Sequence, residues 1–389
     1  MLKITIIFVL LALYSNAFAD NQELKTVNRI IDSVGKKYAP DKRTALFNVS
    51  FTENSREVIL KGTTNLPDAK SMLLDSLSIL KISYTDSVIV LPEKSMGEKT
   101  WAIATLSVDN IRAAPDHASE LVSQALMGTP LKVIEVVDGW CHIQTPDQYI
   151  GWVDEKGVAL KTDAEMTLWK HNKRFVFNQI TGYADNSSKR KANHVSDLVL
   201  GDLFETVSVT KKYLHIKFPD GRTAYVKKSD CLAYEEWIDQ QPDVAAVLSV
   251  SKELLGHPYM WGGTSSKAVD CSGMVKTAWF SQAVILARDA SQQARYGVKV
   301  DFNKAENLKQ GDLLFFGSSA QHITHVGMYL ENGLYIHASG LVRINSINPK
   351  DPLYVITERK SLVAAIRIMN SVDTEGIVSV KNHPWYQGN

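Results

Sequence analysis

The chain has 389 residues, of which 22% are charged and 45% hydrophobic, and its formal net charge is +1. This length indicates about two to four domains, and the composition is that of an ordinary globular protein. Because the charge is nearly balanced, nothing in it favours nucleic acid or an anionic membrane as a partner.

Residues 1–19 have the pattern of a secretory signal peptide. Lys3 precedes an apolar run over Ile4–Tyr14, and Ala17-Phe18-Ala19 offers a cleavage site before Asp20. The run is too short to span a membrane, and no Cys for a lipid anchor lies near the cleavage point. No later apolar stretch reaches about 18 residues. We therefore expect an exported protein, periplasmic or extracellular, without a membrane anchor.

Residues 20–95 are predicted to form a small α/β domain, because helical and strand-like periodicities alternate along them. The predicted elements are a helix over Glu23–Lys37, strands over Ala45–Phe51 and Glu57–Lys61, a helix over Leu66–Leu80 and a strand over Ser83–Leu91. No chemistry can be assigned to this domain, and a docking or stabilising platform is the default expectation.

Residues 99–160 and 165–235 contain an internal repeat. His142-Ile143 and Pro146-Asp147 recur as His215-Ile216 and Pro219-Asp220, with a constant offset of 73 and no gap. Short strands interrupted by Pro-Asp and Gly turns predict small β-barrels. The pattern resembles bacterial SH3-like domains, which are often associated with cell-wall recognition. Rigid scaffolding is the alternative role, above all for the more divergent second copy.

Cys271 follows Asp270 at the start of a segment with helical periodicity, Cys271–Ile285. The first-turn N–H groups and the helix dipole favour a thiolate there, and the thiolate is the species that attacks. Asp270 is a candidate N-cap, and Gly273 permits close approach of another backbone. The alternative is a structural cysteine, because free Cys packs well in protein interiors.

Two histidines lie on a predicted hairpin, 54 and 66 residues after Cys271. If Asn332 is the centre of a three-residue loop, Gly327 faces His337, and His325 lies two residues along on the same face. A two-residue Asn-Gly loop would place the histidines on opposite faces, because a one-residue slip inverts the pleat. A nucleophilic Cys with a base and an orienting group therefore requires the odd-length loop.

The remaining cysteines and histidines give no metal or cofactor site. Cys141 and Cys231 are expected to be buried thiols, although a disulfide between them is the alternative. His322 and His325 are three residues apart and would point to opposite faces of a strand, which disfavours a metal pair. No Gly-rich phosphate loop or Cys-x-x-Cys is present. We expect no cofactor and no metal.

Five motifs resemble, in order and spacing, the NlpC-type (NlpC/p60-like) cell-wall cysteine peptidases. They are Pro258-Tyr259-Met260-Trp261-Gly262-Gly263, Asp270-Cys271-Ser272-Gly273, Arg288-Asp289-Ala290-Ser291-Gln292-Gln293, Leu308-Lys309-Gln310-Gly311-Asp312-Leu313-Leu314-Phe315-Phe316 and His325-Val326-Gly327-Met328-Tyr329-Leu330. The resemblance covers residues 242–370 and implies a reduced papain-like domain. It implies Cys271 as nucleophile, His325 as general base, His337 as its orienter and Tyr259 as an oxyanion-hole donor.

The predicted elements of residues 242–370 make this an α+β domain within a multi-domain chain. They are helices over Val244–Leu255 and Cys271–Ile285, and strands over Asp312–Phe316, Ile323–Leu330, Leu334–Ala338 and Leu362–Met369. The polar tail 371–389 is expected to be poorly ordered.

Two SH3-like domains ahead of such a domain resemble the γ-D-glutamyl-L-diamino-acid endopeptidases of the dipeptidyl-peptidase VI type. The resemblance implies hydrolysis of muropeptides between D-Glu and the diamino acid, preferably in stems with a free N-terminal L-Ala. It implies that Asp289 holds that ammonium group and that Tyr149 closes the same end of the cleft. The chain departs from the family at Ala287, where Pro is usual, and at Ala114, where an acid is common; Asp116 is the nearest substitute.

Three further residues are grouped with the substrate-binding set. Trp261 either walls the cleft or lies in the core, Asp270 is first of all a cap, and Ser272 follows the nucleophile. Cys271 and His325 are expected to rest as a thiolate–imidazolium pair, or to be driven toward it by substrate. We expect a monomer acting on muropeptides. The alternatives are an N-acetylmuramoyl-L-alanine amidase, an acyltransferase and a wall-binding protein with a decayed site.

Overall fold

The computed structural model describes residues 22–54, 57–189 and 191–387. The predicted signal peptide, 1–19, lies outside the described residues. Contacts divide the chain into two compact units at Gly97 and Glu98, and the finer domain bounds given above stay predictions. None of the helices in the described ranges is long and apolar enough to cross a membrane.

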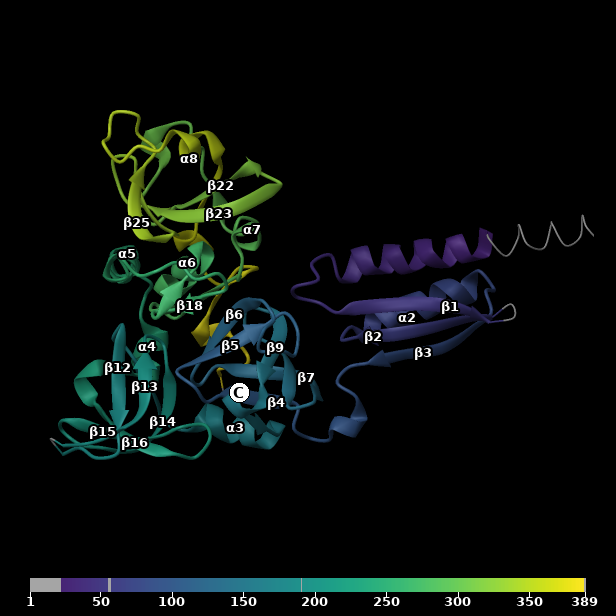
Figure 1. Cartoon of the computed structure of the whole chain (residues 1–389), viewed down its shortest axis with the longest axis horizontal. Helices are drawn as coiled ribbons and strands as arrows, with labels where there is room; N and C mark the ends of the chain where they lie inside the picture. Colours follow the sequence, from purple (N-terminus) through teal and green to yellow (C-terminus); the bar gives the residue numbers. More distant parts are fainter. Residues whose placement is uncertain (1–21, 55–56, 190, 388–389) are drawn as a thin grey trace, which may run out of the picture. The chain divides into compact units, whose positions relative to one another are not determined.

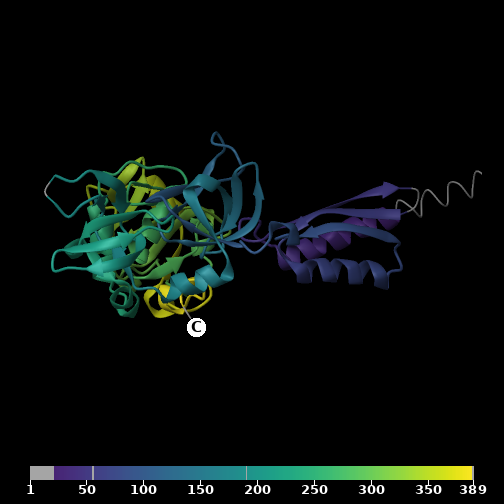
Figure 2. The same ribbon diagram turned by 90° about the horizontal axis from the view of Figure 1, so that it is seen from below.

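The first unit is a three-stranded sheet with two helices, a helix over 22–38 and α2 (Pro67–Ile79). Its strands β1 (Phe47–Asn54), β2 (Glu57–Thr64) and β3 (Tyr84–Val90) lie in chain order. β1 and β2 pair antiparallel, whereas β2 and β3 pair parallel through the α2 crossover. Figure 2 shows both helices on one face of this sheet. Each of the five predicted elements is present.

Two seven-stranded antiparallel sheets begin the second unit, and their strand orders are equivalent: β10-β4-β7-β8-β9-β5-β6 and β17-β11-β14-β15-β16-β12-β13. The first contains β4 (Trp101–Ala104), β5 (Val108–Arg112), β6 (Leu121–Leu126), β7 (Pro130–Val137), β8 (Trp140–Gln144), β9 (Ile150–Asp154) and β10 (Val158–Lys161). The second contains β11 (Arg174–Phe177), β12 (Thr181–Asp185), β13 (His194–Val199), β14 (Leu203–Val209), β15 (Tyr213–Lys217), β16 (Thr223–Lys227) and β17 (Cys231–Ala233). We call them the first and second SH3-like sheets.

The offset of 73 holds in the structure. The starts of β8 and β15, Trp140 and Tyr213, differ by 73, as do the starts of β9 and β16. Even an aromatic pair repeats: His142 stacks on Trp152 at 4.2 Å, and His215 stacks on Tyr225 at 4.6 Å. One helix between the two sheets was not expected. Helix α3 (Asp163–His171) precedes the second sheet, because Thr162 and Glu165 form a capping box.

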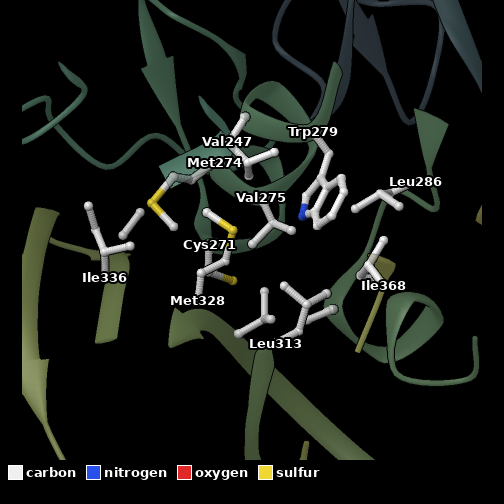
Figure 3. Close-up of a cluster of buried hydrophobic side chains, with 14 of the residues drawn as sticks. Val247, Cys271, Met274, Val275, Trp279, Leu286, Leu313, Met328, Ile336 and Ile368 are labelled. Carbon is white, nitrogen blue, oxygen red and sulfur yellow. The ribbon is translucent and has the colours of Figure 1, made fainter. Parts of the chain in front are cut away.

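The α+β class is confirmed in the rest of the unit, where helices pack on a six-stranded antiparallel sheet of order β21-β26-β22-β23-β24-β25 (Figure 1). The strands are β21 (Val298–Lys299), β22 (Leu313–Ser319), β23 (His322–Tyr329), β24 (Leu334–Ser339), β25 (Leu341–Ser346) and β26 (Leu362–Arg367). The helices and short strands around it are α4 (Tyr234–Asp239), α5 (Val244–Glu253), β18 (Thr264–Ser265), β19 (Ala268–Val269), α6 (Cys271–Phe280), β20 (Val284–Leu286), α7 (Ala290–Gln293), α8 (Ile356–Ser361) and β27 (Ile377–Ser379). Figure 3 shows the core between α6 and the sheet, including Met274, Val275, Leu313 and Met328.

Two expectations are wrong. Helix α6 ends at Phe280 instead of reaching Ile285, because Ala283 has a φ of +55° and the β-branched residues after it form β20. The tail is well packed: β27 pairs with β20, and Tyr386 is 2% exposed. The Tyr386 carbonyl accepts hydrogen bonds from Arg174 Nη2 and from the Tyr234 hydroxyl. A short aromatic tail is therefore ordered by the core that it completes.

The β18–β19 hairpin fixes the SH3-like sheets to the domain that carries Cys271. Thr264 exchanges hydrogen bonds with both the side chain and the backbone of Gln124 in β6. Lys267 contacts Ser107 near the first sheet and forms an ion pair with Asp197 of β13 in the second. The hairpin thus contacts both sheets, which positions them against the site.

Candidate active site

Cys271 is the first residue of α6, and its side chain lies in the core beside Met328 (Figure 3). Asp270 caps the helix, because its Oδ1 accepts a hydrogen bond from Gly273 N at 2.7 Å. A Cβ at Gly273 would collide with the carbonyl oxygen of Gly263, so the close approach expected there is confirmed. The N–H of Cys271 itself has no hydrogen-bond partner among the described residues. It is one of the orphan donors of a helix start.

The histidine hairpin has the register predicted from its loop. Gly327 pairs with His337, and Asn332 and Gly333 both have positive φ. His325 Nε2 lies 2.8 Å from His337 Nδ1. The backbone N–H of Val326, the residue after His325, lies close enough to the Cys271 sulfur to lower the pKa of the thiol, against the larger effect of burial. The structure therefore pairs the two imidazoles and brings the residue after His325 close to the thiol.

Burial sets the protonation of these groups. It raises the pKa of the Cys271 thiol to about 11, with the charge of Asp270 adding to the shift. It lowers the pKa of His325 to about 4 and the pKa of His337 to about 3. These directions favour a thiol and two neutral imidazoles at neutral pH, which argues against the resting ion pair. The alternative, in which substrate drives proton transfer, stays a prediction.

The His325–His337 bond also fixes which tautomer is competent. For His325 to accept a proton on Nδ1, its Nε2 must carry hydrogen and donate to His337 Nδ1. His337 then carries its own proton on Nε2, a buried atom without a hydrogen-bond partner in the described ranges. The ring of His337 is nevertheless held in place, since it packs against Tyr335 at 4.9 Å and is fully buried.

Arg288 is a part of the site that the sequence did not reveal. Its side chain is 1% exposed, and Nη2 lies 2.5 Å from Asp270 Oδ2 while Nη1 lies 3.0 Å from Ser272 Oγ. Asp270 also accepts hydrogen bonds from Ser272 Oγ and Gly262 N. Asp270 and Ser272 thus have their partners inside the protein. The sequence indicates Arg288 only through the Arg-Asp motif, in which the family resemblance implicates Asp289.

Tyr259 lies close enough to Cys271 for the charge of the thiolate to raise the pKa of its phenol, after burial, to about 12. Its backbone is fixed by a bridge to Val269 and by a hydrogen bond from Tyr259 N to Gly340 O. A phenol that stays protonated to such a high pH remains a hydrogen-bond donor.

Trp261 is a surface residue and not part of the core, since it is 62% exposed. Its Nε1 donates to Glu120 Oε1 of the first SH3-like domain at 2.7 Å. The carboxylate of Asp116, suggested as a substitute for the acid missing at Ala114, accepts a hydrogen bond from Ala118 N in its own loop. Glu120 was missed because nothing in its local sequence marks it.

Tyr149 is 7% exposed and lies near enough to Arg288 for its charge to affect the pKa of that guanidinium. Asp289 caps helix α7 together with Gln292 and lies 3.8 Å from Arg288 Nη1. The two residues predicted at the amine-binding end therefore both approach Arg288.

No group of three or more metal-ligating side chains occurs in the part of the chain that the structure describes. The other two cysteines are free, Cys141 being buried and Cys231 half-buried.

Comparison with known proteins identifies the family. Residues 256–357 match the NlpC/P60 family, and residues 111–158 match the bacterial dipeptidyl-peptidase SH3 domain. The chain is 28% identical to dipeptidyl-peptidase 6 of Lysinibacillus sphaericus over 70% of this chain and 99% of that protein. It is 31% identical to the gamma-D-glutamyl-L-lysine dipeptidyl-peptidase of Bacillus cereus over 60% of this chain and 72% of that protein.

Solved structures of NlpC/P60 proteins share the fold of this chain. An NlpC/P60 family protein from Bacillus cereus superposes with a TM-score of 0.59 at 25% identity, covering 69% of this chain and 99% of that one. An NlpC/P60 endopeptidase from Photobacterium damselae shares the fold with a TM-score of 0.51 at 18% identity, covering 68% and 70% of the two chains. With the thiol, the paired histidines and the SH3-like sheet in place, this chain belongs to the NlpC/P60 family of cysteine peptidases.

Proposed function

We propose that the protein is an exported peptidase that hydrolyses the γ-D-glutamyl–diamino acid bond of peptidoglycan stem peptides with a free N-terminal L-Ala. The observation that carries this proposal is the pairing of His325 and His337 at 2.8 Å, with the neighbouring Val326 backbone close to the Cys271 thiol at the start of α6. The names of the relatives supply the substrate class. The protein acts as a monomer on muropeptides, with no cofactor.

In this mechanism the Cys271 thiol gives its proton to His325 Nδ1 while the sulfur attacks the side-chain carbonyl of D-Glu. The unpaired N–H of Cys271 and the Tyr259 hydroxyl donate to the oxyanion of the tetrahedral intermediate. The protonated His325 then gives its proton to the leaving amine, and a thioester remains on the sulfur. Water then gives a proton to His325 and attacks the thioester, and His325 returns that proton to the departing sulfur, which restores the thiol. His337 holds the ring of His325 throughout.

Specificity for the free amine rests on Asp289 and Tyr149. Asp289 supplies the negative charge for the ammonium group, and its position is set by the α7 cap and by Arg288. Tyr149 comes from the first SH3-like domain, which the contacts of the β18–β19 hairpin hold in place. Trp261 lines the approach and is held by Glu120.

Mass spectrometry of digested muropeptides tests the proposal. Wild-type enzyme should release L-Ala-D-Glu, and Cys271→Ala should release none. Cys141→Ala is the matched control, because it removes another buried thiol and should leave cleavage intact. Release of whole stem peptides from the sugar would instead identify an amidase. Equal cleavage of free and N-acetylated stems would refute the roles of Asp289 and Tyr149.

A further inference from the structure

Four exposed lysines gather at one end of the second SH3-like sheet. Lys211 and Lys212 form the turn before β15, while Lys227 ends β16 and Lys228 follows it. The backbone joins the two pairs, since Lys228 N donates to the carbonyl of Lys212 at 2.9 Å. A surface pocket of about 340 Å³ opens between them, lined by Lys211, Lys212, Tyr213, Lys227 and Ser229. We call it the lysine pocket.

Among the described residues, no ion pair compensates the charges of the lysine pocket. Within residues 22–54, 57–189 and 191–387, none of these four lysines forms an ion pair, whereas Lys217 on the same strand pairs with Glu205 at 3.1 Å. The nearest acid along the chain, Asp230, accepts a hydrogen bond from Ser229 Oγ. Four neighbouring cations repel one another, and a bound anion would relieve that repulsion.

The internal repeat supplies a control for the role of this charge. With the offset of 73, the positions of Lys211, Lys227 and Lys228 correspond to Asp138, Asp154 and Glu155 in the first copy. β8 and β9 of the first copy nevertheless have the same lengths and pairing as β15 and β16 of the second. The fold therefore accepts either sign at this corner, and the lysines are not a requirement of the β-barrel.

From these observations we infer that the lysine pocket binds oxyanions, the phosphate or carboxylate groups carried in series by a linear polyanion. Each ammonium group offers three donors without a fixed geometry, which suits either oxyanion. The hydroxyls of Tyr213 and Ser229 add neutral donors at the wall. This role is separate from peptide hydrolysis, because Figure 1 places β15 and β16 at the opposite end of the unit from β22 and β23.

A linear polyanion fits the lysine pocket better than a membrane surface does. None of its lining residues is aliphatic, and peripheral membrane binding relies on buried apolar area together with charge. Val209, two residues before Lys211, is 42% exposed, so anionic vesicles are the necessary comparison.

The test measures binding of the full chain to inorganic polyphosphate, to polyglutamate and to anionic phospholipid vesicles. The pocket variant is Lys211→Glu, Lys227→Glu, Lys228→Glu. The matched control reverses three exposed lysines elsewhere, Lys299, Lys304 and Lys350. Thermal melting verifies that both variants fold.

We expect the pocket variant to lose about tenfold or more in affinity for at least one polyanion, and the control about twofold or less. The salt dependence of binding should also become shallower in the pocket variant alone. Equal losses in both variants would show an effect of net charge only and would overturn the inference. So would binding of vesicles alone, or no binding of either polyanion. Which of the two binds more tightly separates phosphate from carboxylate.

Discussion

Replacing Lys276 by Met is expected to detach the loop that presents Tyr149 from helix α6. Lys276 Nζ lies 2.6 Å from Asp147 Oδ2 and 2.9 Å from the carbonyl oxygen of Leu286. The carbonyl before Asp147 is also held by the tail, since Pro146 O accepts a hydrogen bond from His383 Nε2. The helix that begins with Cys271 therefore also anchors the loop of the first SH3-like domain.

The size of the effect follows from burial. The side chain of Asp147 is 7% exposed and that of Lys276 is 17% exposed. At an effective dielectric constant of about 20, opposite charges this close attract by roughly 6 kcal/mol before the cost of desolvation. Removing one partner of a buried pair costs about 3–5 kcal/mol. Because Lys276 is partly exposed, we expect a loss of about 2–3 kcal/mol in the free energy of unfolding.

The dependence on pH has a definite sign. Burial opposes ionisation of Asp147, but the charge and hydrogen bond of Lys276 outweigh it and lower the pKa of the carboxyl. A lowered pKa in the folded state gives stability that is present above the ordinary pKa and lost as the pH falls through the folded value. The stability difference between wild type and Lys276→Met should accordingly shrink in acid.

A double-mutant cycle with Lys276→Met and Asp147→Asn measures the coupling by urea unfolding. Lys217→Met is the control, because it breaks an ion pair whose lysine is 48% exposed and should cost at most about 1 kcal/mol. In muropeptide cleavage, Lys276→Met should raise KM for stems with a free amine more than for N-acetylated stems. A coupling energy below about 0.5 kcal/mol, or equal changes in both KM values, would refute this account.

Four further outcomes are expected. The activity of the free enzyme should decline on the acid side near pH 4, where His325 protonates, and a midpoint near 6.5 in kcat/KM would contradict the buried imidazole. Tyr259→Phe should lower kcat about 100- to 1000-fold if the phenol binds the oxyanion, and an unchanged kcat would exclude that role. Gly273→Ala should abolish cleavage and lower the melting temperature, because its Cβ would strike the Gly263 carbonyl; a fully active Ala variant would contradict the contact. Burial raises the pKa of Asp109 from 3.8 to about 7, so the folded state loses stability as the pH rises between these two values, and the loss is complete above about pH 7. Asp109→Asn should therefore stabilise the protein by about 1–3 kcal/mol at pH 8 and little at pH 4, and a pH-independent effect in urea unfolding would contradict this.

Local patterns in the sequence predicted what depends on local geometry. The three-residue loop centred on Asn332 predicted that Gly327 pairs with His337, because the length of a hairpin loop sets the register of its strands. The repeat predicted two equivalent sheets, and the acidic residue before Cys271 predicted a cap.

Contacts between distant segments could not be predicted in this way. Arg288 meets Asp270 across 18 residues, and Glu120 meets Trp261 across 141. Neither contact has a periodicity or spacing that a single sequence would display. The packing of the C-terminal tail was not predicted for the same reason. The tail sequence around Tyr386 is mostly polar, but Tyr386 itself packs beside Arg174 and Tyr234 from the second SH3-like region.

The contacts of the β18–β19 hairpin and of Tyr386 limit how this protein can be recombined with others. A chimaera that grafts residues 242–370 onto a foreign targeting module would remove both partners of Lys267, the Trp237 ring that packs against Phe280, and Tyr386, which lies in the same core cluster as Ile285. The segment that can be transferred intact is therefore the whole stretch from Glu98 to Tyr386. The two SH3-like sheets are an integral part of the enzyme and not a separable targeting module.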